Sequence, residues 1–170
     1  MSQTDFAFSG VYAAALTPQT DAGAPDIGLM ASHCRWLLDN GCDGLAILGT
    51  TGEANSFTVE ERIAILDGLK DAGIPGDALM PGTGACALPD AVTLTRAALK
   101  NGAKGVLMLP PFYYKSPSDD GLFAAYSEII QAVGDADLKV CLYHFPQMSG
   151  VPIPYSLIER LLKEYPGTVV

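Results

Sequence analysis

A short apolar run that ends in a turn of glycines and threonines constrains this chain more than any other feature. Residues 44–48 read Gly-Leu-Ala-Ile-Leu, the pattern of a strand buried on both faces. Residues 49–53 follow as Gly-Thr-Thr-Gly-Glu, and a helical pattern then runs from Thr58 to about Asp71. Strand, polar loop and helix make one βα unit. Parallel α/β proteins place their chemistry in the loop at the carboxyl end of such a strand.

The same unit recurs along the chain, with helix signals at several of its boundaries. Asp26 is suited to cap one helix, residues 58–61 form a capping box, and Pro89 falls in a first turn, where its missing N–H is harmless. The expected strands are 10–16, 44–48, a weak one at 79–82, 105–109, 139–143 and the start of a sixth at 167–170, and the expected helices are 27–40, 58–71, 88–99, 121–133 and 155–164.

An internal repeat supports this alternation. Residues 40–48 (Asn-Gly-Cys-Asp-Gly-Leu-Ala-Ile-Leu) are similar to residues 101–109 (Asn-Gly-Ala-Lys-Gly-Val-Leu-Met-Leu), a spacing of two βα units of about 30 residues each. Strict βα alternation predicts a parallel sheet, either in a (β/α)8 barrel or in a doubly wound fold. No G-x-G-x-x-G follows the first strand, which disfavours a dinucleotide-binding fold.

We therefore expect an α/β protein of the (β/α)8 TIM-barrel class. A whole barrel takes about 250 residues, and the chain has 170. Residues 1–170 are expected to be the N-terminal part of one barrel domain, covering roughly the first five and a half βα units and truncated at the start of strand 6. Such a part alone would expose apolar edges that favour association.

Composition and charge narrow the classes of function that this chain can have. Hydrophobic residues make up 49% of the chain and charged residues 17%, which indicates a globular protein, and the net charge of −9 disfavours nucleic acid as a partner. No apolar run approaches the roughly 20 residues of a membrane span, and the N-terminus lacks the pattern of a signal peptide. The four cysteines (Cys34, Cys42, Cys86 and Cys141) are scattered. We expect free thiols, no metal site and a cytoplasmic protein.

Candidate functional side chains lie on loops that follow the strands. They are Thr50, Thr51 and Glu53 after the second strand, Tyr113, Tyr114 and Lys115 after the fourth, and Tyr143 and His144 at the end of the fifth. The paired threonines offer hydroxyls and free backbone N–H groups for a small carboxylate or an oxyanion, or they form only a turn. Tyr143 is either a buried core tyrosine or a proton relay. Lys115 is expected to be solvated, and Glu53 to accept hydrogen bonds from its own loop.

Three motifs together carry a resemblance to a known family. Residues 49–53, 110–114 (Pro-Pro-Phe-Tyr-Tyr) and 143–150 (Tyr-His-Phe-Pro-Gln-Met-Ser-Gly) resemble, in order and spacing, signatures of the dihydrodipicolinate synthase/N-acetylneuraminate lyase family. The similarity extends from Phe8 to Val170. It implies a (β/α)8 barrel, class I aldolase chemistry on pyruvate without metal or cofactor, and a homotetramer built as a dimer of tight dimers.

The resemblance also implies roles for individual residues. Thr50 and Thr51 match the pair that holds the pyruvate carboxylate, and Thr50 also joins a hydroxyl relay. Tyr143 matches the tyrosine that moves protons at the Schiff base. Tyr113 matches the tyrosine that reaches into the neighbouring subunit's site. Gly49, which opens the first motif, is grouped with the substrate-binding positions.

Two departures from the family pattern bear on activity. The Schiff-base lysine of the family lies on strand 6, just after a run like residues 168–170, so its position falls beyond this chain and the 170 residues alone are expected to be inactive. True dihydrodipicolinate synthases carry an arginine that holds the carboxylate of the aldehyde partner where this chain has Met148. An apolar residue there is closer to the neuraminate lyase pattern.

The sequence thus favours an aldolase or lyase that joins or releases pyruvate and an aldehyde, of the 2-keto-3-deoxy-acid or N-acetylneuraminate type. Dihydrodipicolinate synthase is the alternative that Met148 disfavours. A non-catalytic barrel relative that lacks the lysine is an alternative from a different class. A phosphate-binding barrel is a further one, although the usual phosphate loops follow strands 7 and 8.

Overall fold

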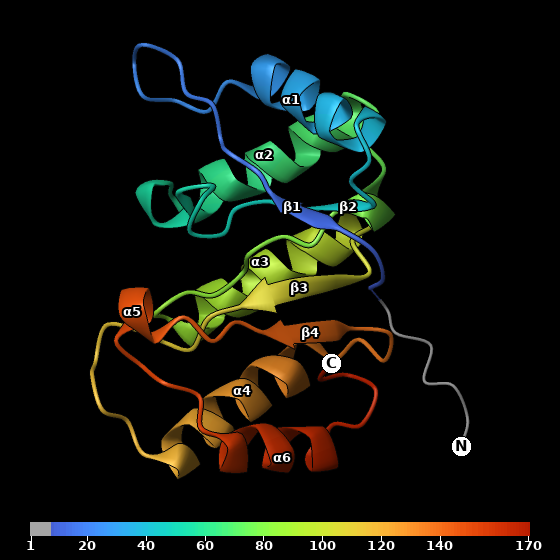
Figure 1. Ribbon diagram of the computed structural model, residues 1–170. Helices are drawn as coiled ribbons and strands as arrows, with labels where there is room; N and C mark the ends of the chain where they lie inside the picture. The colour runs from blue at the N-terminus through green and yellow to red at the C-terminus, as the bar shows by residue number, and fades with distance from the viewer. Residues whose placement is uncertain (1–7) are drawn as a thin grey trace.

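Short parallel strands form the centre of the computed structural model, which describes residues 8–170 (Figure 1). Strand β1 (Tyr12–Ala14) pairs with β2 (Gly44–Ala46), and β3 (Gly105–Met108) pairs with β4 (Lys139–Leu142), both in parallel. All four strands fall inside the ranges predicted from the sequence, and each is shorter than predicted.

The extended segment 79–82 joins the two strand pairs into one sheet. On one side the Met80 N–H donates to the Leu45 carbonyl at 2.9 Å, and on the other the Leu107 N–H donates to the Pro81 carbonyl at 2.9 Å. The bridges on both sides are parallel. The third predicted strand is thus present as isolated bridges instead of a regular strand, since Pro81 has no N–H to donate.

Residues 168–170 extend the sheet beyond β4. The Val140 N–H donates to the Thr168 carbonyl at 2.7 Å, and the Val170 N–H donates to the Val140 carbonyl at 3.1 Å. Spatial order therefore follows chain order from β1 to residues 168–170, with every pairing parallel. That order is the one found along the wall of a (β/α)8 barrel. Among residues 8–170 the sheet does not close, and β1 and 168–170 form its two edges.

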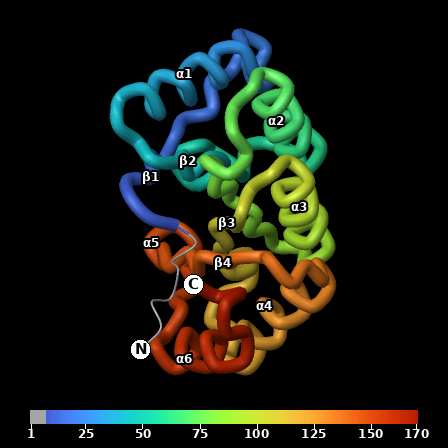
Figure 2. Tube along the Cα trace, turned by 90° about the vertical axis from the view of Figure 1, so that its right-hand side faces the viewer, coloured from blue at the N-terminus to red at the C-terminus, as the bar shows by residue number. Residues whose placement is uncertain are grey.

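Helices flank the sheet in sequence order, as Figures 1 and 2 show. They are α1 (Ile27–Asp39), α2 (Val59–Asp71), α3 (Leu88–Lys100), α4 (Asp119–Val133), the single turn α5 (Pro146–Ser149) and α6 (Tyr155–Glu164), with 3₁₀ turns at Ala54–Ser56 and Gly76–Ala78. The five longer helices match the predicted ones, and each contacts the next, from α1 to α4 and then α6. The turn α5 lies in a segment predicted to be a loop.

The helix boundaries follow from local capping. The Leu29 N–H donates to the Asp26 carboxylate at 2.9 Å, and Thr58 and Glu61 exchange the two hydrogen bonds of a capping box. The hydroxyl of Ser118 accepts from the Gly121 N–H at 3.1 Å, so α4 begins two residues before the predicted start.

The core lies between the sheet and the helices. Leu45, Ile47, Val106, Met108 and Val140 are fully buried, whereas Ala46, Leu107 and Cys141 remain partly exposed. Within the predicted buried run 44–48, Gly44, Leu45, Ile47 and Leu48 are buried and only Ala46 is partly exposed. On the helix side the largest buried side chains are Met30, Ile65, Leu66, Leu69, Leu94, Tyr126 and Ile129. None of the helices within 8–170 has the length and apolarity that crossing a membrane requires.

Candidate active site

Two of the predicted site residues meet at the carboxyl edge of the sheet. The Thr50 Oγ1 atom lies 3.1 Å from the Tyr143 phenol oxygen, in a partly buried hydrogen bond. Tyr143 continues the line of β4, and its N–H donates to the Met108 carbonyl at 2.9 Å. The phenol is therefore held from its backbone end by the neighbouring strand and from its oxygen by the threonine.

A strained residue ends the line of β2 just before Thr50. Leu48 has φ of +53°, in the left-handed region, and its side chain is nonetheless 1% exposed. This conformation costs a side-chain-bearing residue roughly 1–2 kcal/mol. The extended chain therefore stops at Leu48 and turns into residues 49–53. Glu53, also left-handed with φ of +51°, closes that turn and has an exposed side chain.

The turn is folded back onto the ends of two strands. The Thr17 hydroxyl, which follows β1, donates to the Gly52 carbonyl at 2.7 Å in a buried hydrogen bond. A Cβ on Gly52 would lie 2.9 Å from the Leu48 nitrogen and 3.0 Å from the Ala15 carbonyl oxygen. Only glycine fits this approach, so the second glycine of the Gly-Thr-Thr-Gly motif has a packing reason.

Close backbone contacts also form the floor of the site. A Cβ on Gly82 would lie 2.1 Å from the Leu48 carbonyl oxygen, and one on Gly84 would lie 2.7 Å from the Leu109 nitrogen. Arg62 of α2 donates to the Gly82 carbonyl at 2.8 Å and is 4% exposed. Burial lowers the pKa of Arg62 to about 10, with the nearby Asp90 charge acting in the opposite direction. These contacts fix segment 82–84 against the end of β2.

A small pocket lies among these loops. Its volume of about 20 Å³ has room for about one water molecule. Gly49, Thr50 and Tyr143 line it together with Leu48, Ala54, Asn55, Gly82, Gly84, Leu107 and Leu109. The apolar lining and the paired hydroxyls suit a site in which a proton passes between two oxygens. Of these residues, sequence reasoning did not single out Asn55, Gly82 or Gly84, although the Gly-x-Gly that begins at the end of the third predicted strand was a visible signal.

Three predicted site residues lie outside this pocket. The Thr51 side chain is exposed, in contrast to that of Thr50. Tyr113 is 72% exposed, packs edge-to-face on Tyr114 at a centroid distance of 5.1 Å, and lines a separate apolar pocket of about 240 Å³. Met148 is 62% exposed on α5. The structure therefore brings together Thr50, Gly49 and Tyr143, and leaves the other three on the surface.

Two of the remaining candidates, His144 and Lys115, form hydrogen bonds with loop backbone. Nδ1 of His144 accepts a hydrogen bond from the Ile153 N–H at 3.0 Å, which closes its own loop. Lys115 is exposed, as expected, and its ammonium in addition donates to two backbone carbonyls. The expected hydrogen bonds to the Glu53 carboxylate are not found among the described residues. Residues 8–170 hold no group of three or more His, Cys, Asp or Glu side chains arranged for a metal ion.

Comparisons with known proteins identify the family to which the chain is similar. The model of the dihydrodipicolinate synthetase family matches residues 7–170. An uncharacterized DapA-like lyase from Chloroflexus aurantiacus is 40% identical over 157 residues, which are 92% of this chain and 52% of the lyase.

Solved structures match at a similar level. Dihydrodipicolinate synthase from Agrobacterium tumefaciens superposes with a TM-score of 0.90 at 38% identity, over 94% of this chain and 56% of the synthase. YagE, a protein of the dihydrodipicolinic acid synthase family from E. coli K12 solved in complex with pyruvate, gives 0.82 at 29% identity, over 92% and 51% of the two chains. The chain thus spans about half the length of the relatives it matches.

Proposed function

This chain belongs to the dihydrodipicolinate synthetase family, and on that premise we propose that it supplies the pyruvate-handling part of a class I aldolase or lyase. The reaction joins pyruvate to an aldehyde, or releases the two, through a Schiff base. Support comes first from the hydrogen bond between Thr50 and Tyr143, which pairs two proton-carrying oxygens at the carboxyl edge of the sheet. The pyruvate in the YagE structure is consistent with this substrate.

In this proposal the two oxygens act as a proton relay. Tyr143 exchanges a proton with the reacting oxygen of the substrate, and the Thr50 hydroxyl, 3.1 Å away, carries it onward. Thr51 and the backbone of Gly49 take part in holding the pyruvate carboxylate beside Thr50. Thr51 is exposed at the same turn.

No lysine of the described part of the chain is a candidate for the Schiff base. Lys115, the one that follows a strand at its carboxyl end, is engaged with the carbonyls of Phe112 and Ser149. The proposal therefore requires a lysine supplied beyond residue 170. If the complete gene product carries none, the chain belongs to a non-catalytic barrel relative.

Met148 bears on the choice of aldehyde. It is an exposed apolar side chain where an arginine would hold a carboxylate, and this favours a 2-keto-3-deoxy-acid or N-acetylneuraminate type of reaction. The runner-up is dihydrodipicolinate synthase, which the name of the Agrobacterium relative favours. Exposed Tyr113 is consistent with a contact across a subunit boundary, as in a dimer of dimers.

Borohydride trapping on the complete gene product tests the proposal. Incubation with pyruvate and borohydride is expected to add one reduced pyruvate to a single lysine, located by peptide mass spectrometry. The 170-residue chain, as the matched control, is expected to take up none. Absence of an adduct on the folded complete protein would refute the class I mechanism. If the adduct forms, activity on a series of aldehydes with and without a carboxylate separates the two substrate types.

A further inference from the structure

We propose that Lys115 is a positioning residue that locks the Tyr113–Tyr114 loop onto the α5 turn that carries Met148. This inference rests on the proposed function, since it concerns the rim of the same site. The two segments follow neighbouring strands, β3 and β4, and reach the same edge of the sheet.

The contacts of the ammonium define the lock. Lys115 Nζ donates to the Ser149 carbonyl at 2.9 Å in a partly buried hydrogen bond, and also to the Phe112 carbonyl of its own loop. The Ser149 carbonyl lies at the carboxyl end of α5, where backbone oxygens have no partner within the helix. Lys115 therefore satisfies an otherwise unpaired carbonyl and joins segments 34 residues apart.

The acceptor is itself held firmly. Ser149 is 2% exposed, and its hydroxyl oxygen accepts from the Val151 N–H at 3.1 Å while its proton has a partner in the Phe145 carbonyl at 3.1 Å. A carbonyl in such a turn has little freedom to follow a moving lysine. The restraint is therefore on the lysine and its loop.

An independent observation comes from Gly150. This residue has φ of +65°, and a Cβ built on it would lie 3.2 Å from Cδ, 3.3 Å from Cε and 3.4 Å from Nζ of Lys115. The lysine stem thus lies directly across Gly150. The glycine that ends α5 both adopts the left-handed conformation and leaves room for the lysine.

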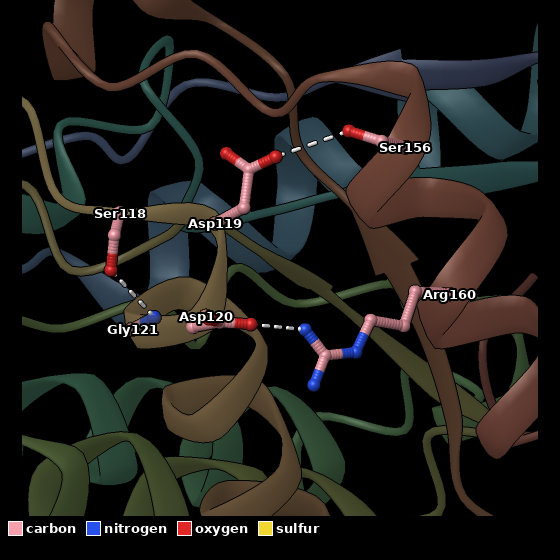
Figure 3. Close-up of polar contacts among 6 residues, drawn as sticks. All are labelled: Ser118, Asp119, Asp120, Gly121, Ser156 and Arg160. Atoms are coloured by element: carbon pink, nitrogen blue, oxygen red, sulfur yellow. Dashed lines mark hydrogen bonds and ion pairs between the residues drawn. The ribbon is translucent and has the colours of Figure 1, made fainter.

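A second tie joins the far ends of the same two loops, at the start of α4 and in α6 (Figure 3). Arg160 pairs with Asp120 at 2.6 Å, and Ser156 donates to Asp119 at 3.1 Å. The guanidinium of Arg160 also lies 3.7 Å from the centroid of the Phe123 ring. The Asp120 side chain is 88% exposed, so this ion pair is weak. The contact of Lys115 with the Ser149 carbonyl is partly buried, so water shields it less than it shields this ion pair.

The residues next to Lys115 and Ser149 in the chain are the ones whose positions this contact restrains. Tyr114 directly precedes Lys115, and Met148 directly precedes Ser149. The contact with Ser149 therefore restrains the backbone that carries the exposed aromatic pair relative to the backbone that carries the exposed methionine. Neither partner of the Thr50–Tyr143 contact takes part in it. Loss of Lys115 should loosen recognition of the aldehyde and leave the pyruvate step intact.

The test uses the complete gene product with Lys115→Met, which keeps the stem and removes the ammonium. The expected result is a rise in the aldehyde KM on the order of tenfold, faster hydrogen exchange in residues 112–118, and wild-type trapping of pyruvate by borohydride. Lys115→Arg, which keeps a cation with donors, is expected to restore most of the loss. Lys163→Met, on the exposed face of α6, is the matched control and should change none of these quantities.

Other outcomes would overturn the inference. An unchanged aldehyde KM together with unchanged exchange in Lys115→Met would show that no lock exists. Loss of pyruvate trapping in that variant would show that Lys115 acts in the pyruvate step instead. If wild-type protein traps no pyruvate, the proposed function fails, and the exchange measurement alone still decides whether Lys115 holds the loop.

Discussion

The phenol oxygen of Tyr143 and the hydroxyl of Thr50 lie 3.1 Å apart, although 93 residues separate them in the chain. Their strands, β2 and β4, are not neighbours, because segment 79–82 and β3 lie between them. Three steps of about 4.8 Å would hold the two strand ends about 14 Å apart in a flat sheet. The contact therefore depends on an arc-shaped sheet, as in the wall of a barrel.

The Thr50–Tyr143 pair should behave as a unit in catalysis. In the complete gene product, Tyr143→Phe is expected to lower kcat by about a hundredfold to a thousandfold, because positioned proton transfer contributes on that scale. Thr50→Val should have a similar effect, and the double variant should be little worse than either single one. Steady-state kinetics and a double-mutant cycle measure this. Tyr155→Phe, at a side chain that is 90% exposed, is the control; strictly additive losses would disprove a shared relay.

The residue at position 148 should select the aldehyde. Met148→Arg is expected to raise kcat/KM for an aldehyde that carries a carboxylate by about tenfold or more relative to an uncharged one, because hydrogen bonds to a charged group contribute on that scale. Met148→Leu, similar in size and apolar, should leave the ratio unchanged. Competition assays with paired aldehydes measure this ratio of kcat/KM values. An unaltered ratio in the arginine variant would show that position 148 does not select the aldehyde.

Gly82 should tolerate no side chain. Gly82→Ala places a Cβ 2.1 Å from the Leu48 carbonyl oxygen, a backbone atom that cannot rotate away. We expect a loss of unfolding free energy of about 3 kcal/mol, the upper end for overpacking. Urea denaturation measures it. The matched control is Gly28→Ala in α1, where the nearest atom to the new Cβ is 3.6 Å away, and which should be neutral or stabilising by up to about 1 kcal/mol. Equal stabilities for the two variants would contradict the packing described for the site floor.

Stability should fall on the alkaline side because of Cys34. Burial raises the pKa of this thiol from 9.0 to about 11, with Arg35 acting in the opposite direction. Below pH 9 both states hold the proton, and between pH 9 and about 11 only the unfolded thiol ionises. The unfolding free energy should therefore decrease across that window, by on the order of 2 kcal/mol. Urea denaturation at several pH values in this window measures the unfolding free energy of the wild type and of Cys34→Ala, which should lose this part of the pH dependence. The same dependence of the unfolding free energy on pH in both proteins would refute the assignment.

Several local features could be predicted from the chain alone. Capping residues such as Asp26 and Thr58, and the alternation of apolar runs with helical patterns, located the five longer helices to within two residues at their starts. They also placed Thr50 after a strand and Tyr143 at the end of one. Each of these signals lies within a few neighbouring residues, and the capping hydrogen bonds that they predict also join residues close together in the chain.

Other features depend on segments that meet only in the folded molecule. The exposure of Thr51 beside the partly buried Thr50, the left-handed Leu48 and the lock of Lys115 on Ser149 have no counterpart in the sequence pattern. The contact of Lys115 with Ser149, for example, joins residues 34 positions apart, which no local pattern indicates. Local periodicity and capping therefore gave the order of strands and helices, whereas the contact between Thr50 and Tyr143 depends on the arc that the whole sheet forms.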